Sequence, residues 1–418
     1  MTKRPSPNTL YTNDNLYVLS GLNSESVDLI YLDPPFNSKR MYTAPVGSKA
    51  AGARFKDTWT WKDVDEYYLD TLADQFPTLA RYIANVGGVH GKPMMAYLTF
   101  MAQRVIETYR ILKETGSFYL HCDPTASHYL KILLDFVFGK SNFRNEIVWC
   151  YTGPSGAKRN FPAKHDTILR YSKSDVFVFN HDLVRIPYQA LHTDKGKNAT
   201  IWKTEGKLQD ETIRQQYIER GKIPEDFWID IPSGGHISPE ERTGYPTQKP
   251  LALLKRIIRA SSNEEDTVLD PFCGCATTCV AAQQLGRKWI GIDIEKHAVK
   301  VLIQRLSNDA GLFKDFVATD QIPKRSDTEE VQPSDSVKQR LYQEQDSKCN
   351  ACGREFEIGN FEIDHIVPKS KGGNDCYENY QLLCGSCNRV KGDRPMEYLR
   401  LKIETRERMM KNKIFFGE

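Results

Sequence analysis

Short apolar runs alternate with segments of helical spacing through most of the chain before residue 315. The apolar run at 27–32 ends at Asp33-Pro34-Pro35, and two prolines end a strand because they lack the N–H that a sheet needs. Strands that alternate with helices predict a parallel sheet covered by helices, whose ligands bind beyond the carboxyl ends of the strands. The predicted strands are 27–32, 117–121, 267–269 and 289–293, and the predicted helices are 97–112, ended by Thr115-Gly116, and 277–285.

A polar segment at 319–335 separates this alternating region from a cysteine-rich C-terminal region. The segment is rich in Asp, Glu, Ser and Pro and has almost no apolar residues, which is the composition of a linker. The predicted organisation is a first domain at 1–318, a linker at 319–337, a second domain at 338–400 and a basic C-terminal helix at 401–418.

The overall composition excludes some classes of protein and leaves others open. Of the 418 residues, 40% are hydrophobic and 27% are charged, which excludes a fully disordered chain. There is no apolar run long enough to span a membrane and no secretory signal, so we expect no membrane partner and a cytoplasmic location in a bacterial or phage-infected cell. Without a signal peptide, the ten cysteines are expected to be reduced thiols or metal ligands.

The net charge of +3 argues neither for nor against nucleic acid, but one segment is locally basic. From Tyr151 to Glu205 there are nine Lys and Arg against five Asp and Glu, interleaved with aromatic residues. This mixture suits a phosphate backbone and exposed bases, so 152–236 is a candidate target recognition region. A solvated insertion explains the charge equally well.

The end of the first predicted strand carries the first candidate site. Asp33-Pro34-Pro35-Phe36 places a carboxylate, a rigid turn and an aromatic ring together, and the prolines leave free carbonyl acceptors nearby. A carboxylate and a carbonyl can accept both hydrogens of a planar amino group while the ring stacks on its base. A simple proline turn is the alternative.

A second strand end adds a cofactor pattern. Asp270 to Thr278 forms a loop of small residues between a strand and a helix, through which backbone N–H groups can approach a ligand closely. The loop has no GxGxxG pyrophosphate motif, and the next strand ends in Asp293, an acid that can bind both hydroxyls of a ribose. An adenosine cofactor without phosphate is therefore expected, and S-adenosylmethionine fits.

Residues from about 10 to 315 resemble the permuted beta group of DNA amino-methyltransferases, which share a Rossmann-like α/β sheet with an inserted target recognition region. Asp33-Pro34-Pro35-Phe36 resembles their catalytic motif and precedes the methyl-donor motif, an order specific to few methyltransferases. His121-Cys122-Asp123 and the run from Lys164 to Leu169 resemble weaker signatures. The resemblance implies cofactor-binding roles for Asp270, Pro271, Phe272, Gly274 and Asp293, and for Thr247, Gln248 and Lys249 of the motif Tyr245 to Pro250; Cys275 departs from the small residue usual there.

The chemistry of the methylated base narrows the reaction. Cytosine C5 methylation uses a cysteine nucleophile, usually in a Pro-Cys pair, and no proline here precedes a cysteine. The resemblance favours adenine N6, because Asp33 stands where cytosine N4 enzymes more often have Ser. The base must then flip out of duplex DNA, with Phe36 as its stacking partner. A cytosine N4 enzyme and an RNA methyltransferase are the alternatives.

The C-terminal cysteines have the spacing of a metal site. Cys349 and Cys352 form one CxxC knuckle and Cys384 and Cys387 form another, and two such knuckles can give four thiolates to one structural zinc. Free thiols or a redox pair are the alternatives, and Cys376 lies outside the pattern.

The residues between and after the knuckles resemble the His-Asn-His (HNH) nucleases, which have a ββα-metal fold, over about 338 to 395. The resemblance implies that His365 is the general base, that Asp364 and Asn388 hold one Mg²⁺ or Mn²⁺ ion, and that Asn379 braces the loop of His365. Asn388 stands where the name-giving pattern has its last His. The expected function is a DNA adenine methyltransferase joined to an endonuclease in restriction–modification or phage DNA processing; a zinc module that only binds DNA is the alternative.

Overall fold

The structure of the protein is a computed structural model. It describes residues 8–37, 40–45, 47–51, 54–57, 72–73, 75–151, 153, 155–187, 216, 219–295, 297–308, 316–328, 331–371, 373–394, 396, 399–400 and 402–403. Much of the candidate recognition region, including 188–215, and nearly all of the expected C-terminal helix at 401–418 lie outside these ranges. Among the described residues, no helix has the length and apolar character needed to cross a membrane.

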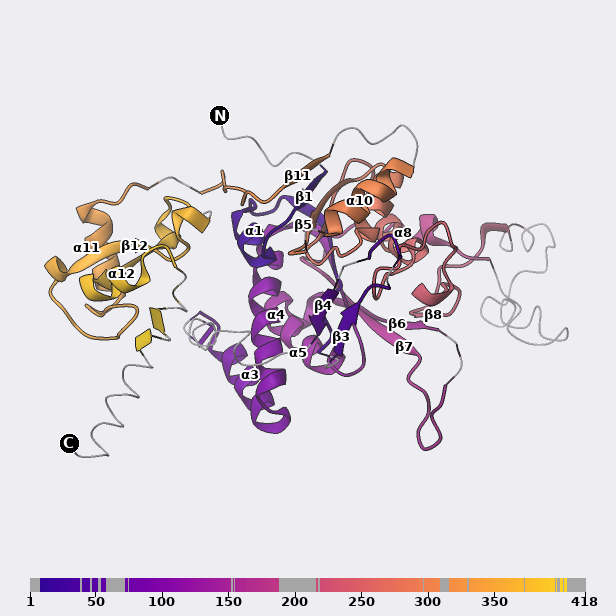
Figure 1. Ribbon diagram of the computed structural model, residues 1–418, viewed down its shortest axis with the longest axis horizontal. Coiled ribbons are helices and arrows are strands. Elements are labelled where there is room, and N and C mark those ends of the chain that lie inside the picture. The colour runs from indigo at the N-terminus through magenta and orange to yellow at the C-terminus, as the bar shows by residue number, and fades with distance from the viewer. Residues whose placement is uncertain are drawn as a thin grey trace.

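One sheet of nine strands forms the centre of the large domain (Figure 1). Six neighbouring strands, β11 to β5 in the sheet order, are parallel, as the alternating pattern predicts. At one edge the sheet is mixed, because β7 runs antiparallel to both β5 and β6. In sheet order the strands are β11 (Val317–Thr319), β1 (Thr9–Tyr11), β10 (Lys288–Ile292), β9 (Thr267–Asp270), β2 (Val27–Leu32), β5 (Leu112–Cys122), β7 (His165–Ser172), β6 (Phe143–Cys150) and β8 (Phe227–Trp228).

Helices cover both faces of this sheet, as expected for an α/β protein. One core joins the sheet to α1 (Asn15–Gly21), α3 (Pro77–His90), α4 (Lys92–Ile111) and α5 (Ser127–Phe138). On the other side of the sheet, α8 (Leu251–Ser261), α9 (Thr277–Gln284) and α10 (His297–Asn308) contribute to a second core. A separate hairpin is formed by β3 (Arg40–Thr43) and β4 (Arg54–Asp57).

The order of the strands fixes where a ligand can bind. β9 and β2 are neighbours in the sheet, but the chain continues from β9 to β10 on one side and from β2 to β5 on the other. Such a switch of direction leaves a crevice at the carboxyl ends of the two strands. The predicted motifs at Asp33 and Asp270 directly end these strands.

The C-terminal region forms a small body of its own, drawn in orange and yellow in Figure 1. It contains α11 (Asp335–Glu344), the antiparallel pair β12 (Phe361–His365) and β13 (Tyr380–Cys384), and α12 (Gly385–Lys391). Its apolar residues form a separate cluster around Leu341, Phe361 and Leu382. Two strands followed by a helix agree with the expected ββα arrangement.

The segment expected to be a linker is hydrogen-bonded at both ends. At its start, Ser326 and Asp327 bind Asn23 and the backbone N–H of Ser24, next to α1. At its end, the N–H of Val331 donates to the carbonyl of Asp375 in the small body. The helix α11 already begins at Asp335, inside the range 319–337. The described residues of this polar segment therefore form hydrogen bonds with both domains.

Candidate active sites

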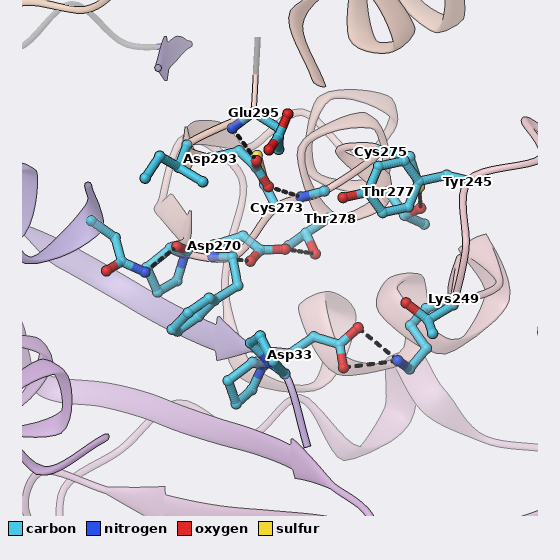
Figure 2. Close-up of a pocket in the computed structure, with 18 of the residues that line it drawn as sticks. Asp33, Tyr245, Lys249, Asp270, Cys273, Cys275, Thr277, Thr278, Asp293 and Glu295 are labelled. Carbon is cyan, nitrogen blue, oxygen red and sulfur yellow. Dashed lines mark hydrogen bonds and ion pairs between the residues drawn. The ribbon is translucent and has the colours of Figure 1, made fainter. Parts of the chain in front are cut away.

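A cavity of about 810 Å³ lies where β2, β9 and β10 end. Its lining includes Asp33, Pro34, Pro35 and Phe36 from the first predicted motif. The methyl-donor motif also lines it, and Figure 2 shows Asp270 and Asp293 across the cavity from Asp33. The structure thus brings together all the methyltransferase residues predicted from sequence, which are Asp33, Pro34, Pro35, Phe36, Thr247, Gln248, Lys249, Asp270, Pro271, Phe272, Gly274 and Asp293.

The carboxylate of Asp33 is held by a lysine that sequence reasoning placed at the cofactor. Lys249 Nζ lies 2.8 Å and 2.6 Å from the two oxygens of Asp33, and both side chains are largely buried (Figure 2). The same ammonium lies 5.2 Å from the centre of the Phe36 ring. Lys249 therefore lies on the Asp33 side of the cavity and donates hydrogen bonds to its carboxylate.

Phe36 rests on a buried histidine that was not assigned a role from sequence. The rings of Phe36 and His121 stack with centroids 5.8 Å apart and planes 19° apart. His121 is fully buried, with Nδ1 at 2.8 Å from the hydroxyl of Tyr31 and Nε2 at 3.0 Å from Asp166. The weak signatures around 121 and 166 were the sequence features that could have revealed this network.

Asp166 connects this histidine to a neighbouring strand. Its second oxygen accepts a hydrogen bond of 3.1 Å from the hydroxyl of Tyr151. Burial alone would raise the pKa of Asp166, but the hydrogen bond and charge of His121, together with Lys249, hold that pKa below its usual value. The carboxylate therefore stays ionised and fixes the His121 ring beneath Phe36.

The loop from Asp270 to Thr278 is shaped by Asp270 and Gly274. Asp270 accepts hydrogen bonds from the backbone N–H of Phe272 at 3.0 Å and from the hydroxyl of Thr278, and burial raises its pKa to about 7. Gly274 has φ of +50°, and a Cβ there would lie 3.0 Å from the ring of Tyr245. A side chain at 274 would thus be strained and would push Tyr245 away from the loop.

Asp293 stands at the end of β10 with its carboxylate directed to this loop. Its oxygens accept hydrogen bonds from the N–H groups of Gly274 at 2.9 Å and of Glu295 at 2.7 Å. Burial raises the pKa of Asp293 to about 6. An acceptor held by two backbone donors beside a small-residue loop fits a pair of ribose hydroxyls, so the donor set agrees with an adenosine-type cofactor.

A buried brace behind the loop was missed entirely from sequence. Asn15 Nδ2 donates to the carbonyl of Pro271 at 2.8 Å, and Arg104 Nε donates to Asn15 at 2.6 Å. Arg104 also pairs with Asp14 at 3.1 Å, although only 4% of the arginine is exposed. An arginine among apolar residues in the middle of α4 was the only sequence feature pointing to this contact.

The other residues of the 245–250 motif have different surroundings. Gln248 accepts from the N–H and hydroxyl of Thr243 at 2.9 Å and 2.7 Å, which fixes the turn that precedes Lys249. Thr247 lines the cavity with a positive φ of +62°. Cys275, the departure from the family pattern, is buried in a small apolar cluster with Tyr245. It fits the loop without opening it.

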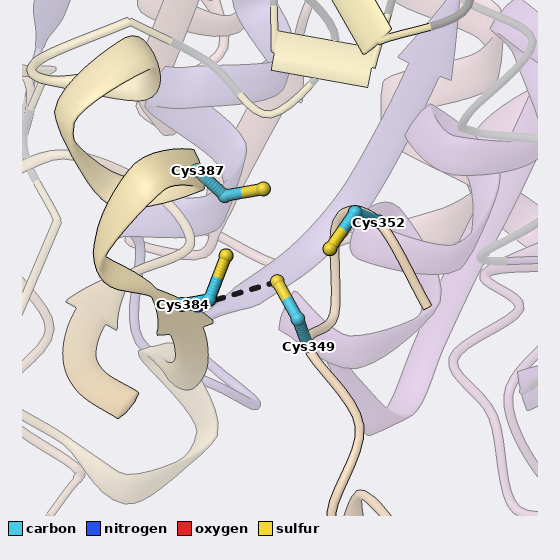
Figure 3. Close-up of side chains that lie close together, drawn as sticks. All are labelled: Cys349, Cys352, Cys384 and Cys387. Carbon is cyan, nitrogen blue, oxygen red and sulfur yellow. Dashed lines mark hydrogen bonds between the residues drawn. The ribbon is translucent and has the colours of Figure 1, made fainter. Parts of the chain in front are cut away.

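The four predicted zinc ligands lie together in the small body (Figure 3). The sulfur atoms of Cys349, Cys352, Cys384 and Cys387 are all within 4.8 Å of one another. A hydrogen bond from the Cys387 thiol and backbone donors, including the N–H of Cys384, lower the pKa of Cys349. Four sulfurs at this spacing, one of them favoured as thiolate, fit the tetrahedral thiolate shell of a metal such as zinc.

His365 ends β12 and has an acidic partner that sequence reasoning missed. Its Nε2 lies 2.9 Å from Asp375, which also binds Lys369 at 2.7 Å and the hydroxyl of Tyr380 at 3.0 Å. The hydrogen bond from Lys369, followed by those from His365 and Tyr380, lowers the pKa of Asp375 to about 2. An ionised Asp375 orients the imidazole and leaves its other nitrogen available.

Asn379 ties down the loop that follows His365. Its side chain accepts from the N–H of Val367 at 2.8 Å and donates to the carbonyls of Val367 and Asn374 at 3.1 Å and 2.9 Å. Gly373 allows this close packing, because a Cβ there would lie 1.7 Å from the carbonyl oxygen of Val367. These contacts match the bracing that the resemblance implied.

Both residues expected to hold a divalent cation have protein partners instead. The oxygens of Asp364 bind Gln381 Nε2 at 2.7 Å and Lys391 Nζ at 3.1 Å, and only 1% of Lys391 is exposed. Asn388, on α12, donates from its side-chain amide to Glu362, which lies on β12 with Asp364. Oxygen donors of this kind suit Mg²⁺, and a cation bound to Asp364 would have to displace the Lys391 ammonium.

Comparisons with known proteins agree with this geometry. A family model described as "DNA methylase", of the N6 and N4 type, matches residues 27–305, and one described as "HNH endonuclease" matches 349–394. The type II methyltransferase M.EcaI of Enterobacter cloacae is 29% identical over 75% of this chain and 72% of its own length. The DNA adenine methyltransferase YhdJ of Escherichia coli is also 29% identical, over 78% of this chain and 93% of its own length.

Solved structures show similarity at lower identity. The modification methylase TTHA0409 of Thermus thermophilus, complexed with S-adenosylmethionine, aligns with 75% of this chain and 98% of its own at 17% identity and a TM-score of 0.43. The cytosine-N4-specific PvuII methyltransferase covers 73% of this chain and 91% of its own at 15% identity and a TM-score of 0.45. With a family model matching more than half of its length, the chain belongs to the N6/N4 DNA methylase family and carries a C-terminal HNH endonuclease domain.

Proposed function

We propose that the large domain transfers a methyl group from S-adenosylmethionine to the exocyclic N6 of an adenine flipped out of duplex DNA. The observation that carries this proposal is a single cavity with Asp33 and Phe36 on one side and the Asp270 loop and Asp293 on the other. Its volume of about 810 Å³ is large enough for a nucleoside cofactor and a base together.

The acceptor side positions the amine. Phe36, fixed from below by His121, stacks on the base, while Asp33 and the nearby proline carbonyls accept the two hydrogens of the amino group. Lys249 must release at least one oxygen of Asp33 as the base enters. In this position the amine nitrogen would face the sulfonium methyl of a bound donor, and Asp33 would accept the proton that the amine loses on methyl transfer.

The donor side holds the cofactor. When bound, S-adenosylmethionine supplies an electrophilic methyl group on a sulfonium. Asp293 accepts hydrogen bonds from the ribose hydroxyls, and the N–H groups of the loop around Gly274 approach the ligand because no side chain intervenes. The brace from Arg104 through Asn15 keeps the loop in this conformation.

Two features support adenine over cytosine. The first residue of the catalytic motif is Asp33, the residue commoner in adenine enzymes of the resembling group. A relative that aligns over nearly its whole length is named a DNA adenine methyltransferase. The type II methyltransferases among the relatives also support a restriction–modification setting.

Substitution of Asp33 tests this division of the cavity. Asp33→Ala should abolish methyl transfer to duplex DNA but leave S-adenosylmethionine binding within about threefold, because Asp33 faces the amine. Asp175→Ala, which changes an exposed acid paired with Arg144, is the matched control and should keep full activity. Loss of donor binding in Asp33→Ala, measured by calorimetry, would refute the assignment.

A second candidate function belongs to the small domain. We infer that it is an endonuclease in which His365, oriented by Asp375, takes a proton from the attacking water, with zinc on the four cysteines as a structural ion. Asp364 and Asn388 remain the proposed ligands of Mg²⁺ or Mn²⁺, and binding would require Lys391 to leave Asp364. The alternative is that the small domain only binds DNA. The ion pair between Lys391 and Asp364 supports this alternative. Magnesium- or manganese-dependent cleavage of duplex DNA by the full chain distinguishes the two.

A further inference from the structure

An exposed arm between β6 and β7 carries the most isolated aromatic side chain of the described residues. The arm comprises residues 153 and 155–164 of the structure, and Figure 1 shows it projecting beyond the sheet. Phe161 in this arm is 100% exposed. This phenyl ring buries no apolar surface against the described residues, so its whole surface is available to a partner.

The arm is basic as well as aromatic. Its sequence from Gly153 to Lys164 contains three cations, Lys158, Arg159 and Lys164, and no acid. Lys158 and Arg159 are exposed, and neither has an acidic partner within the described part of the chain. A polyanion is therefore the partner that this surface fits, with the ring available to an apolar surface between the charges.

The arm starts at the pocket for the target base. The N–H of Tyr151 donates to the carbonyl of Lys164 at 3.0 Å, which closes the base of the arm. The Tyr151 hydroxyl binds Asp166, whose other oxygen holds His121 beneath Phe36. Because β7 is antiparallel to β5, the start of the arm lies at the end of the sheet where the parallel strands have their carboxyl ends.

The length of the arm sets the reach of Phe161. Phe161 precedes Lys164 by three residues, so it can lie up to about 10 Å from the base of the arm. That distance equals about three base steps of duplex DNA. An aromatic ring at this range can insert next to the position that a flipped base leaves.

We propose that this arm is a duplex DNA contact in which Lys158 and Arg159 bind phosphates and Phe161 inserts into the base stack, favouring release of the target base into the cavity. The proposal rests on the proposed methyltransferase function and adds to it a wedge outside the cavity. Apolar wedges that partly unstack a duplex are a recognised way of deforming DNA. Phe161 acts on the equilibrium between stacked and flipped base, and not on the methyl transfer.

The test compares two duplexes that contain the recognition site mapped for the wild-type enzyme. In one the target base is paired, and in the other it lies opposite an abasic position, which lowers the cost of flipping. The Phe161→Ala variant should have a kcat/KM at least about tenfold below that of the wild type on the paired duplex. On the abasic duplex, the kcat/KM of the variant should lie within about threefold of the wild-type value. Phe136→Ala, at a half-exposed phenylalanine on α5, is the control and should change neither.

The possible results separate a failure of the wedge proposal from a failure of the proposed methyltransferase function. Equal losses on both duplexes, or no loss on either, would overturn the wedge while methylation by the wild type keeps the methyltransferase assignment. A wild type that methylates neither duplex would overturn the proposed function itself.

The double variant Lys158→Ala/Arg159→Ala tests the contact with phosphates. It should reduce the slope of DNA affinity against salt concentration by the equivalent of about two phosphate contacts. An unchanged slope would overturn the proposal that Lys158 and Arg159 bind phosphates.

Discussion

Binding of the methyl donor should depend on pH through Asp293. Burial raises the pKa of this carboxyl to about 6, and its ionised form is the one that accepts hydrogen bonds from ribose hydroxyls. At about pH 7 roughly ten carboxyls in eleven are ionised, but at about pH 5 only roughly one in eleven is. Affinity for S-adenosylmethionine should therefore fall about tenfold as the pH drops across this range.

Substitution of Asp293 should remove both the affinity and its pH dependence. Asp293→Asn loses charge-assisted hydrogen bonds of about 1.5–3 kcal/mol, which corresponds to roughly ten- to hundredfold weaker binding at neutral pH. Asp175→Asn changes an exposed acid that pairs with Arg144 and does not line the cavity, so this control should keep the wild-type profile. Calorimetric titrations at three pH values measure the effect. Equal wild-type affinities at about pH 5 and pH 7 would refute the assigned role.

Three further predictions concern the small domain. Cys384→Ser should cost the domain its zinc and its fold, seen as loss of bound zinc and rapid proteolysis after about residue 330; a protease-resistant, zinc-free domain would contradict this. His365→Ala should abolish DNA cleavage and leave methylation within about twofold; a variant that cuts at the wild-type rate would exclude His365 as the base. Lys391→Met should destabilise the domain by about 3 kcal/mol, because it leaves Asp364 buried without a counter-charge, and Mn²⁺ should raise the melting temperature of this variant more than that of the wild type. Melting curves that do not respond to Mn²⁺ would show that Asp364 is not a cation ligand.

Local features made part of this structure predictable. The strand that ends at Asp33 was identified because an apolar run stops at two prolines, and the structure ends β2 at Leu32. The helix and strand around 112 were placed less well, since Thr115-Gly116 lies inside β5 and does not end α4. Gly116 is needed there for a tertiary reason, because a Cβ would approach the carbonyl oxygen of Asp28 to 2.9 Å.

The contacts that complete the sites join residues far apart in the chain. Lys249 and Asp33 are separated by 216 positions, so the motif could show that both matter but not that they pair. Arg104 reaches the donor loop only through Asn15, and no pattern along α4 names that partner. In the small domain, the sequence around Lys391 is that of an exposed polar segment, but Lys391 is buried against Asp364. Partners of buried charges are set by packing, which local sequence does not record.

Identification of the methylated nucleoside tests the central claim most directly. The full-length protein is incubated with S-adenosylmethionine and unmethylated duplex DNA, and the digested DNA is analysed by mass spectrometry, with Asp33→Ala as the inactive control. We predict N6-methyladenine in the wild-type reaction and no methylated nucleoside with Asp33→Ala. N4-methylcytosine alone would overturn the choice of base, and 5-methylcytosine or the absence of any methylated nucleoside would contradict the amino-methyltransferase account of the cavity.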